Sequence, residues 1–491
     1  MTTVTSLASH SPATGELLAR YTVDDAEAVD AAVRRARAAA DWWAGLGFTG
    51  RKGHLLHWKH VLVRELDGIA ELMHQETGKP VDDARLELVL SVDHLDWAAK
   101  HASKELGSRR VPSGLLGFNL SASVSYLPLG VVGVIGPWNY PAFTPMGSIA
   151  YALAAGNTVV FKPSEFATGV GLRFVETFAE AVGGQPVLQA VTGFGDTGAA
   201  LCRSDVDKIG FTGSTATGKR VMAACAESLT PVLIEAGGKD AAIVAADADL
   251  DLAADAITFG AMGNAGQTCV GIERAYVVDA VFDAFVERVA AIAGRVRVGA
   301  EPEAHLGPIT MPGQIPVIRR HIEDAIARGG RAVVGGPESV RPPFVHPVVI
   351  VDVPEDSEAV TEETFGPTLI INRVRTLDEA VDRANSSRYG LGSAVFAGRR
   401  TAIAVADRLH TGMTSINGVQ SFATVPSLPF GGTRESGFGR IHGADGLREF
   451  ARPKAITRPR FRSPANLLSF ARTARDMQIP LRLTRFLHKK G

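Results

Sequence analysis

Apolar and polar residues follow one spacing in the first hundred residues and another in the segment that follows. Residues 24–46 and 50–104 place apolar side chains at helical spacing, and Asp24 or Asp25 can cap the first helix. Residues 108–129 are instead rich in Gly, Pro and Ser and end in an alternating pattern. We therefore predict a helical layer, interrupted by an exposed strand or hairpin that projects as an arm.

From Gly130 onward, short apolar runs alternate with helical segments. The pattern predicts strands at 130–136, 158–162, 187–191, 208–213 and 231–236, helices at 141–155, at 168–182 and from Thr215, and a turn at 193–198. Strand, helix and strand within about thirty residues form a parallel βαβ unit. This repetition is typical of a doubly wound nucleotide-binding domain.

A second α/β region begins after Gly237 and Gly238. It contains the apolar run 241–245, helical patterns at 250–264 and 279–294, and strand patterns at 345–351, 368–374 and 451–458. We predict an α/β fold with a Rossmann-type nucleotide-binding domain, an α/β catalytic domain and a small β oligomerisation arm. The expected divisions are 1–108 with 130–236, then 237–448, then 109–129 with 449–459, and a basic amphipathic tail over 460–491.

Composition narrows the class of protein. The chain has 491 residues, 46% of them hydrophobic and 21% charged, as in ordinary globular proteins. A formal net charge of −1 gives no reason to expect a nucleic-acid partner. The three cysteines have neither metal-ligand spacing nor a disulfide framework, so we predict no metal site and a reducing, cytoplasmic location. The first residues have no secretory signal pattern.

Three residues are candidates for acyl chemistry. Cys269 follows the small residues of AMGNAGQTC and could be a nucleophile, although most such cysteines are buried small hydrophobes. Asn139 in PWNYP could donate to an oxyanion or could simply occupy a turn. Glu235 ends an apolar strand, where partial burial would raise its pKa toward use as a base, unless it lies at an exposed edge.

Two further stretches suit a nucleotide. The segment 210–219 (GFTGSTATGK) places glycines and hydroxyl groups between a strand and a helix, where free N–H groups can bind a phosphate. It is not the usual G-x-G-x-x-G pattern, and a plain tight turn is an equal alternative. Lys162 and Glu165 in FKPSE follow another strand and could hold ribose hydroxyls, or form a solvated loop.

The order of these stretches is more specific than any one of them. PWNYP, KPSE, FTGSTATGK, EAGGK, GQTC, EETFGP and PFGG follow one another at strand ends or turns. In this order, over roughly residues 10 to 460, the chain resembles the NAD(P)-dependent aldehyde dehydrogenases, and the spacing of Glu235 and Cys269 is similar to that in the hydrolytic members. The resemblance implies that Cys269 attacks an aldehyde, that Asn139 and the Cys269 N–H hold the oxyanion, and that Glu235 activates water.

The resemblance also implies a set of cofactor residues. Those matched to the adenosine ribose, phosphate and nicotinamide regions, with Trp138 in support, are Lys162, Ser164, Glu165, Gly195, Gly213, Ser214, Thr217, Glu363 and Phe365. Glu165 would repel a 2′-phosphate, which favours NAD, while the neighbouring Lys162 leaves NADP open.

Some positions depart from the family pattern. Ala236 replaces the usual Leu, and Ser148 and Ile441 occupy positions where many members carry a Lys and a Glu. Gly147 stands where succinate-semialdehyde enzymes often carry an Arg, and GRIHG (439–443) is similar to the branch that acts on fatty and aromatic aldehydes. We expect an apolar aliphatic or aromatic aldehyde as substrate. A small aldehyde such as succinate semialdehyde, transfer to coenzyme A, and a non-catalytic binding role are the alternatives, and Glu235 argues against the second.

The C-terminal tail beyond residue 459 interleaves arginines with apolar residues. Two functions are open: the tail could lie on an anionic membrane as a peripheral contact, or it could pack along its own or a partner subunit. We expect packing, because Pro480 should interrupt a continuous helix. The exposed edge of the predicted arm indicates a homodimer or homotetramer, because such edges are normally covered.

Overall fold

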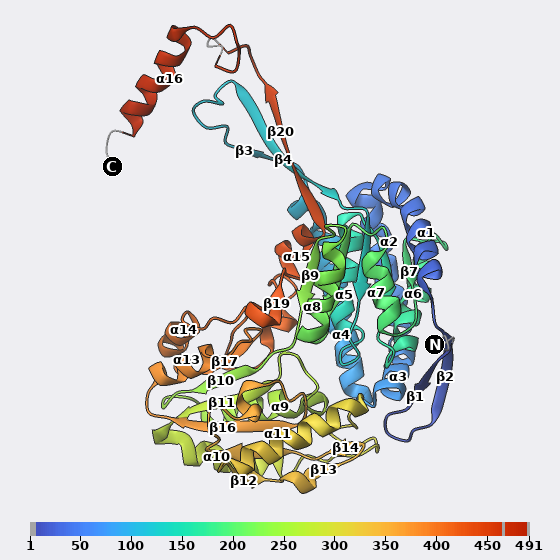
Figure 1. Cartoon of the computed structure of the whole chain (residues 1–491), viewed down its shortest axis with the longest axis vertical. Coiled ribbons are helices and arrows are strands. Elements are labelled where there is room, and N and C mark those ends of the chain that lie inside the picture. Colours follow the sequence, from blue (N-terminus) through green and yellow to red (C-terminus); the bar gives the residue numbers. More distant parts are fainter. Residues whose placement is uncertain (1–5, 464–466, 489–491) are drawn as a thin grey trace.

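The computed structural model describes residues 6–463 and 467–488. Its body contains two sheets with their helices, and a three-stranded arm projects from one end (Figure 1). The first sheet has the order β19-β9-β8-β5-β6-β7 and is parallel except for β19, which runs antiparallel to β9. Its strands are β5 (Val131–Ile135), β6 (Thr158–Lys162), β7 (Leu188–Ala190), β8 (Lys208–Thr212), β9 (Val232–Glu235) and β19 (Gly437–Phe438).

Helices pack around this sheet because their apolar stripes bury against it. The first, α1, spans Ala26–Gly45, and Asp25 caps it by accepting a hydrogen bond from the Ala28 N–H at 2.9 Å. The single helical run expected over 50–104 is divided into three helices at Glu65 and again near Gly78. The other helices of this layer are α2 (Gly47–Arg64), α3 (Leu66–Thr77), α4 (Val81–Leu106), α5 (Phe143–Ala155), α6 (Thr168–Ala181), α7 (Gly195–Arg203) and α8 (Thr215–Ala226).

The second sheet has seven strands in the order β12-β15-β16-β11-β10-β17-β18, parallel except where β12 meets β15. Its strands are β10 (Asp240–Val244), β11 (Ile272–Val278), β12 (Arg331–Val334), β15 (Val348–Val351), β16 (Thr368–Val374), β17 (Ser393–Phe396) and β18 (Ser415–Ile416). Its helices are α9 (Leu250–Met262), α10 (Phe282–Ala293), α11 (Ile315–Ala327), α12 (Glu358–Thr361), α13 (Leu377–Asn385) and α14 (Arg399–Ala406). The predicted α/β fold class, with two largely parallel sheets, is confirmed.

The arm consists of β3 (Arg109–Val111), β4 (Leu120–Pro128) and β20 (Ala451–Pro459), in the order β20-β4-β3. Ala451 pairs with Pro128 and Pro459 with Leu120, so two segments far apart in sequence run side by side and leave β20 as an edge. The short helix α15 (Gly443–Glu449) leads into β20. Two small hairpins complete the strands: β1 (Ser6–His10) with β2 (Leu17–Thr22), and β13 (Val340–Arg341) with β14 (Phe344–Val345).

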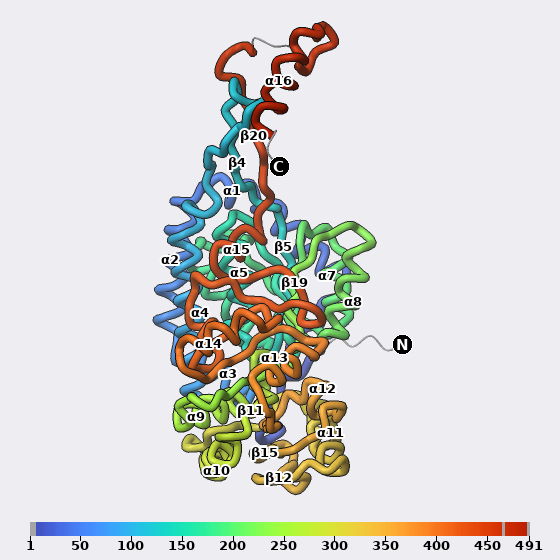
Figure 2. Tube along the Cα trace, turned by 90° about the vertical axis from the view of Figure 1, so that its left-hand side faces the viewer, coloured from blue at the N-terminus to red at the C-terminus, as the bar shows by residue number. Residues whose placement is uncertain are grey.

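Two expectations were wrong. The predicted turn at 193–198 is the start of α7, because the chain enters a helix at Gly195 directly after an extended Phe194. Pro480 does not interrupt the tail, since α16 (Ala474–Leu487) continues through it. Figure 1 and Figure 2 show α16 at the level of the far end of the arm and away from the body, and in Figure 1 it stands apart from the arm strands. Among the described residues, no helix is long and apolar enough to cross a membrane.

Candidate active site

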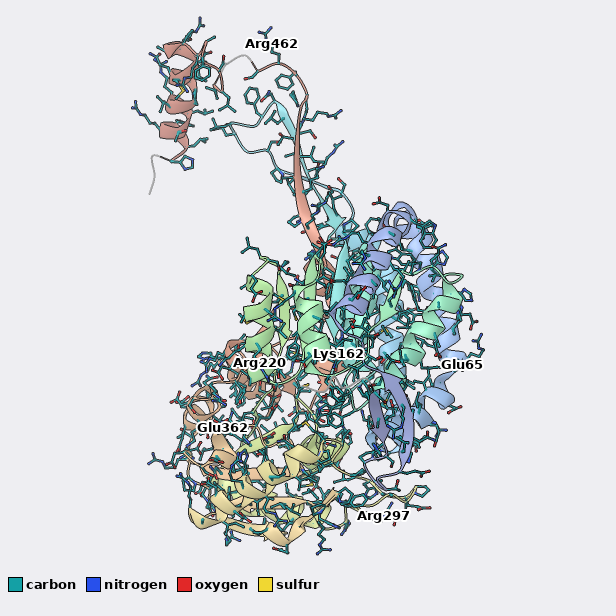
Figure 3. The ribbon with its side chains drawn as sticks, turned by 45° about the vertical axis from the view of Figure 1, so that its right-hand side comes forward. Glu65, Lys162, Arg220, Arg297, Glu362 and Arg462 are labelled. Atoms are coloured by element: carbon teal, nitrogen blue, oxygen red, sulfur yellow. The ribbon has the colours of Figure 1, made fainter. Side chains whose placement is uncertain are left out.

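The carboxyl ends of the first sheet's strands lie at one edge, next to the second sheet. The parallel register pairs Ile135 with Lys162 and Thr212 with Glu235, so the loops after these strands meet there. A cavity of about 830 Å³ lies along this edge and reaches from Glu227 on the outside to Cys269 inside. Figure 3 labels Lys162 and Arg220 in this central part of the molecule.

Cys269 lies on a strained loop after α9. Asn264, Ala265 and Gly266 all have positive φ angles, of 54°, 54° and 73°. Such a conformation costs a non-glycine residue on the order of 1–3 kcal/mol and persists only where surrounding contacts enforce it. Gly266 cannot carry a side chain, because a Cβ there would lie 2.0 Å from the Gly366 carbonyl oxygen.

Side-chain amides enforce this loop. Asn264 Nδ2 donates to the Asn139 carbonyl at 3.0 Å, and Gln267 Nε2 donates to the Asn264 carbonyl at 3.0 Å. The Thr310 N–H donates to Gln267 Oε1 at 2.8 Å. These bonds fix the loop that carries the thiol to the loop that carries Asn139.

The Cys269 thiol faces a buried carboxyl group. Cys269 Sγ donates to Glu235 Oε1 at 3.5 Å, and Thr212 Oγ1 donates to Glu235 Oε2 at 3.3 Å. Burial raises the pKa of Glu235 to about 7, although the two hydrogen bonds oppose this effect. Burial, followed by the nearby Glu235 charge, raises the pKa of the Cys269 thiol well above its usual value. A proton can therefore pass between two groups in direct contact.

Asn139 reaches the same loop from the first sheet. Its Nδ2 donates to the Gln267 carbonyl at 2.9 Å, two residues before Cys269. A primary amide carries two N–H donors, so the second stays available for a substrate oxygen. Tyr140 Oη and Thr268 Oγ1 lie 3.0 Å apart and form a further hydrogen bond between the two loops.

A buried ion pair holds the Asn139 loop from behind. Lys79 Nζ donates to Glu87, and both side chains are almost completely buried. Glu87 Oε1 also accepts from the Ala142 and Phe143 N–H groups, at 2.7 and 3.0 Å, where α5 begins. The Lys79 ammonium lies 3.9 Å from the centre of the Tyr140 ring.

A second buried ion pair holds the opposite wall. Lys239 donates to Glu273, whose carboxylate accepts from the backbone N–H groups of Thr364 and Phe365. Glu363 Oε1 accepts from the Gly238 N–H at 2.8 Å, and burial raises the pKa of Glu363 to about 8.

The paired glycines of EAGGK allow this close packing. A Cβ at Gly237 would lie 2.3 Å from Glu363 Oε2, and one at Gly238 would lie 2.5 Å from the Cys269 carbonyl oxygen. Glu363 and the Cys269 loop therefore lie directly against the end of β9.

The outer part of the cavity offers donors at two helix starts. Gly195 is the first residue of α7, and Ser214 caps α8 by accepting from the Thr217 N–H at 3.3 Å. Lys162 Nζ lies 3.5 Å from Glu165 Oε2, and burial lowers the pKa of Lys162.

Every residue predicted to bind the cofactor lines this cavity, together with Asn139 and Cys269. The members predicted from sequence are Trp138, Lys162, Ser164, Glu165, Gly195, Gly213, Ser214, Thr217, Glu363 and Phe365. The Trp138 and Phe365 rings meet edge to face at 5.5 Å. Glu235 lies behind the wall rather than on it, in contact with Cys269.

The chain is similar to known proteins along most of its length. The aldehyde dehydrogenase family model matches residues 2–456. The chain belongs to the aldehyde dehydrogenase family. It is 37% identical to the 4,4'-diapolycopene aldehyde oxidase of Methylomonas sp, over 94% of this chain and 87% of that protein.

Solved structures of aldehyde dehydrogenases support the same family assignment. The NAD-dependent aldehyde dehydrogenase from Sinorhizobium meliloti matches with a TM-score of 0.89 and 32% identity, over 94% of this chain and 93% of that one. The NADP-dependent glyceraldehyde-3-phosphate dehydrogenase from Bacillus halodurans C-125 matches with a TM-score of 0.88 and 32% identity, over 93% and 96%. This aldehyde dehydrogenase is therefore an oxidoreductase that uses NAD(P).

The residues of this aldehyde dehydrogenase fit a dinucleotide. Two helix N-termini and a buried ammonium face the outer cavity, where pyrophosphate and ribose need donors. Gly195 has open space where a Cβ would be, so the backbone there can approach a ligand closely.

Sequence reasoning missed the two lysine–glutamate pairs. Lys239 belongs to the EAGGK stretch but had no predicted role, and Lys79 had no signal beyond a charged GKP sequence. Of the positions that depart from the family pattern, Ser148 lies beside Gly210 of β8, where a Cβ at Gly210 would be 3.1 Å from Ser148 Oγ. Gly147 packs against Ile441 and His442.

Proposed function

We propose that this enzyme oxidises an aldehyde to its carboxylic acid with NAD(P)⁺ through a thiohemiacetal and a thioester on Cys269. The 3.5 Å contact between Cys269 Sγ and Glu235 Oε1 at the inner end of the cavity carries this proposal. It joins a nucleophile to a base that titrates near neutral pH.

The chemistry follows from these side chains. Glu235 takes the proton of the Cys269 thiol, and the sulfur forms a bond to the aldehyde carbon. The Asn139 amide and the Cys269 backbone N–H donate to the oxygen that becomes negatively charged. Bound NAD(P)⁺ supplies a hydride acceptor. Glu235 releases the thiol proton to solvent and then removes a proton from water, which attacks the thioester; the carboxylic acid leaves, and the Cys269 sulfur takes up that proton to regenerate the thiol.

Trp138, Lys162, Ser164, Glu165, Gly195, Gly213, Ser214, Thr217, Glu363 and Phe365 would hold the cofactor. Helix starts at Gly195 and Ser214 suit its pyrophosphate, and the Lys162–Glu165 pair suits a ribose. Glu363 and Phe365, fixed by Gly238 and Glu273, would orient the reacting ring.

We propose an apolar aliphatic or aromatic aldehyde as substrate. Cys269 packs against an apolar cluster that includes Val270, Phe422 and Phe430. A Cβ at Gly147 would lie 2.7 Å from both His442 Nε2 and Ile441 Cδ1, so this site has no room for the arginine that would bind a second carboxylate. The relative from Methylomonas, which is named for a diapolycopene aldehyde, supports the same class.

NAD is the proposed preferred cofactor, because the Glu165 carboxylate would repel a 2′-phosphate. We expect Glu165→Gln to raise the ratio of kcat/KM for NADP to that for NAD by about tenfold, the effect of one partly screened charge. Steady-state kinetics with both cofactors measure this ratio. An unchanged ratio would place the discrimination elsewhere.

The decisive test is NADH formation with octanal, benzaldehyde and succinic semialdehyde, with Cys269→Ala as the control. Turnover of octanal or benzaldehyde that disappears in the variant supports the proposal. Turnover of succinic semialdehyde alone would reject the substrate class but retain the chemistry. Turnover only with added coenzyme A would indicate acyl transfer, and cofactor binding without any turnover would indicate a binding protein.

We also propose a cytoplasmic homodimer or homotetramer, supported by the unpaired edge of β20 in the arm. Sedimentation velocity of the full chain measures its mass. A monomer at assay concentrations would reject this assembly without affecting the proposed chemistry.

A further inference from the structure

The tail beyond the arm carries a helix that buries nothing. None of the residues of α16 is buried, and the family match ends at residue 456, before this helix begins. Its start is nevertheless well defined, because Thr473 and Asp476 form a reciprocal capping box with hydrogen bonds of 2.8 and 3.4 Å. A helix of this length is marginal in water alone, so its stability depends on a surface that covers its apolar side.

Two faces of α16 differ in chemistry. Arg475, Arg482 and Arg485 are seven and three positions apart, which places them along one stripe. Ile479, Leu483 and Phe486 recur at four and three positions on the adjoining face. Phe486 is 79% exposed. Arginines along the margin of an apolar face are suited to an interface between hydrocarbon and water, where their guanidinium groups reach the polar side.

The end of the arm also exposes apolar side chains. Phe118 and Phe461 contact each other with ring centres 5.8 Å apart, and Leu115 and Leu116 of the same arm are also exposed. In Figure 3, Arg462 lies at this far end, on the side away from the body. Apolar side chains are therefore exposed at both the arm tip and the helix.

Charge is distributed unevenly along the molecule. The sequence has no Asp or Glu from Arg109 to Ser164 or from Phe450 to Arg475, so the arm strands contain no acidic residue. The tail has one acidic residue, Asp476, and its basic residues are Arg460, Arg462, Arg472, Arg475, Arg482, Arg485, Lys489 and Lys490. The whole chain nevertheless has 51 basic and 52 acidic residues, so the remainder is net acidic.

We propose that the arm tip and α16 dock on an anionic lipid bilayer. The exposed apolar residues would enter the boundary between headgroups and acyl chains, and the arginines would bind lipid phosphates. A second copy of the same surface would bring like charge against it, whereas an anionic bilayer complements it. The net acidic body would be repelled by the same bilayer, which leaves the projecting end as the part that binds.

Vesicle co-sedimentation of the full chain tests this docking. We expect binding to phosphatidylcholine vesicles that contain phosphatidylglycerol, little binding to phosphatidylcholine alone, and release by added salt. The triple variant Arg475→Gln, Arg482→Gln, Arg485→Gln should weaken partitioning about a hundredfold, since each basic residue near an anionic surface contributes roughly a fivefold effect. Phe486→Ser should weaken binding to the same vesicles without changing the charge.

The matched control removes three exposed arginines from the body, Arg331→Gln, Arg399→Gln and Arg400→Gln, and should bind lipid like the parent. NADH formation is measured on every variant, so loss of docking is separate from loss of the proposed chemistry. Equal binding by the tail variant and the control would overturn the proposal. Absence of lipid binding by the parent would also overturn the proposal. If in that case the tail variant lowers the oligomeric mass in sedimentation velocity, the tail is a contact between subunits.

Discussion

Two buried carboxyl groups, Glu235 at the end of β9 and Glu273 in β11, have different partners. Glu273 has the Lys239 ammonium beside it and accepts backbone hydrogen bonds from Thr364 and Phe365. Glu235 has no cation in contact within the described chain, and only the Thr212 hydroxyl and the Cys269 thiol donate to it. Both carboxyl groups are almost completely inaccessible to solvent.

The difference in partners distinguishes a carboxylate that supports the structure from a carboxyl group that can exchange a proton. A buried carboxylate with an ammonium partner and backbone donors is held in one place and can position a loop. A buried carboxyl group without a cation loses the stabilisation of its charge, so its pKa rises into the range where it can exchange protons. The same residue type therefore serves as a support on one side and as a base on the other.

The strongest test removes the thiol that makes Glu235 different. We expect Cys269→Ala to lower dehydrogenase kcat by at least about a thousandfold, because the Thr212 hydroxyl, the other side chain that donates to Glu235, is a much weaker nucleophile than a thiolate. Cys225→Ala is the matched control, since Cys225 is a buried cysteine that packs near Cys202 and does not line the cavity. Comparable losses in both variants would reject Cys269 as the nucleophile.

Glu235→Gln should remove the base while retaining the shape. We expect steady-state kcat to fall by about 10²–10⁴-fold, as for other general bases. Its unfolding free energy above pH 7 should be higher than that of the parent enzyme. In the parent, the pKa of Glu235 is higher in the folded state than in the unfolded chain, so ionisation of Glu235 at high pH destabilises the folded state. The glutamine of the variant does not ionise. Steady-state kinetics and urea unfolding measure the two effects. Full turnover in this variant would contradict the assignment.

Glu273→Gln should lower the unfolding free energy, whereas Glu235→Gln should raise it above pH 7. It leaves Lys239 buried without its counter-charge, so we expect a loss of about 3–5 kcal/mol in unfolding free energy. Glu358→Gln breaks the exposed pair with Arg320 and should cost less than about 1 kcal/mol. Urea unfolding followed by fluorescence gives both values. Equal losses would mean that burial does not distinguish the two pairs.

The smallest effect is on the pH profile. With a Glu235 pKa of about 7, kcat should fall about tenfold per unit as pH decreases below 7, because the protonated carboxyl group cannot act as a base. Below its pKa the group is protonated, so activity is present above about pH 7 and lost below it. A profile that stays flat down to pH 5 would show that Glu235 is ionised throughout.

Much of the first sheet could be predicted from sequence. Its strands are apolar runs bounded by glycine or polar residues, and all five predicted strands match β5, β6, β7, β8 and β9 within one or two residues. The candidate site residues could also be predicted, because each follows a strand or lies in a glycine-rich loop. Their convergence in one cavity depends on parallel register, which a single chain's pattern indicates through its βαβ repeats.

Other features depended on contacts that local sequence does not encode. Gly195 and Gly198 are poor helix formers and were interpreted as a turn, yet α7 begins there and packs its Leu201 and Cys202 into the core. In the tail, α16 continues through Pro480, although a proline removes one backbone hydrogen bond of a helix; the capping box of Thr473 and Asp476 at its start is a local signal that the sequence does contain. Glu87 also accepts hydrogen bonds from the Ala142 and Phe143 N–H groups at the start of α5, about 55 residues away, and the local sequence around the Lys79–Glu87 pair does not indicate this contact.

The packing of Gly147 against His442 also sets an order on mutational steps. The His442 imidazole is fully buried among the rings of His94, Phe143 and Phe430, and among the described residues neither of its nitrogens has a hydrogen-bond partner. A larger residue at position 147 therefore requires a smaller residue at position 442 and movement of the Ile441 side chain, whose Cδ1 atom would be equally close. An evolutionary or engineered route that places an arginine at position 147 has to change this pair of neighbours first.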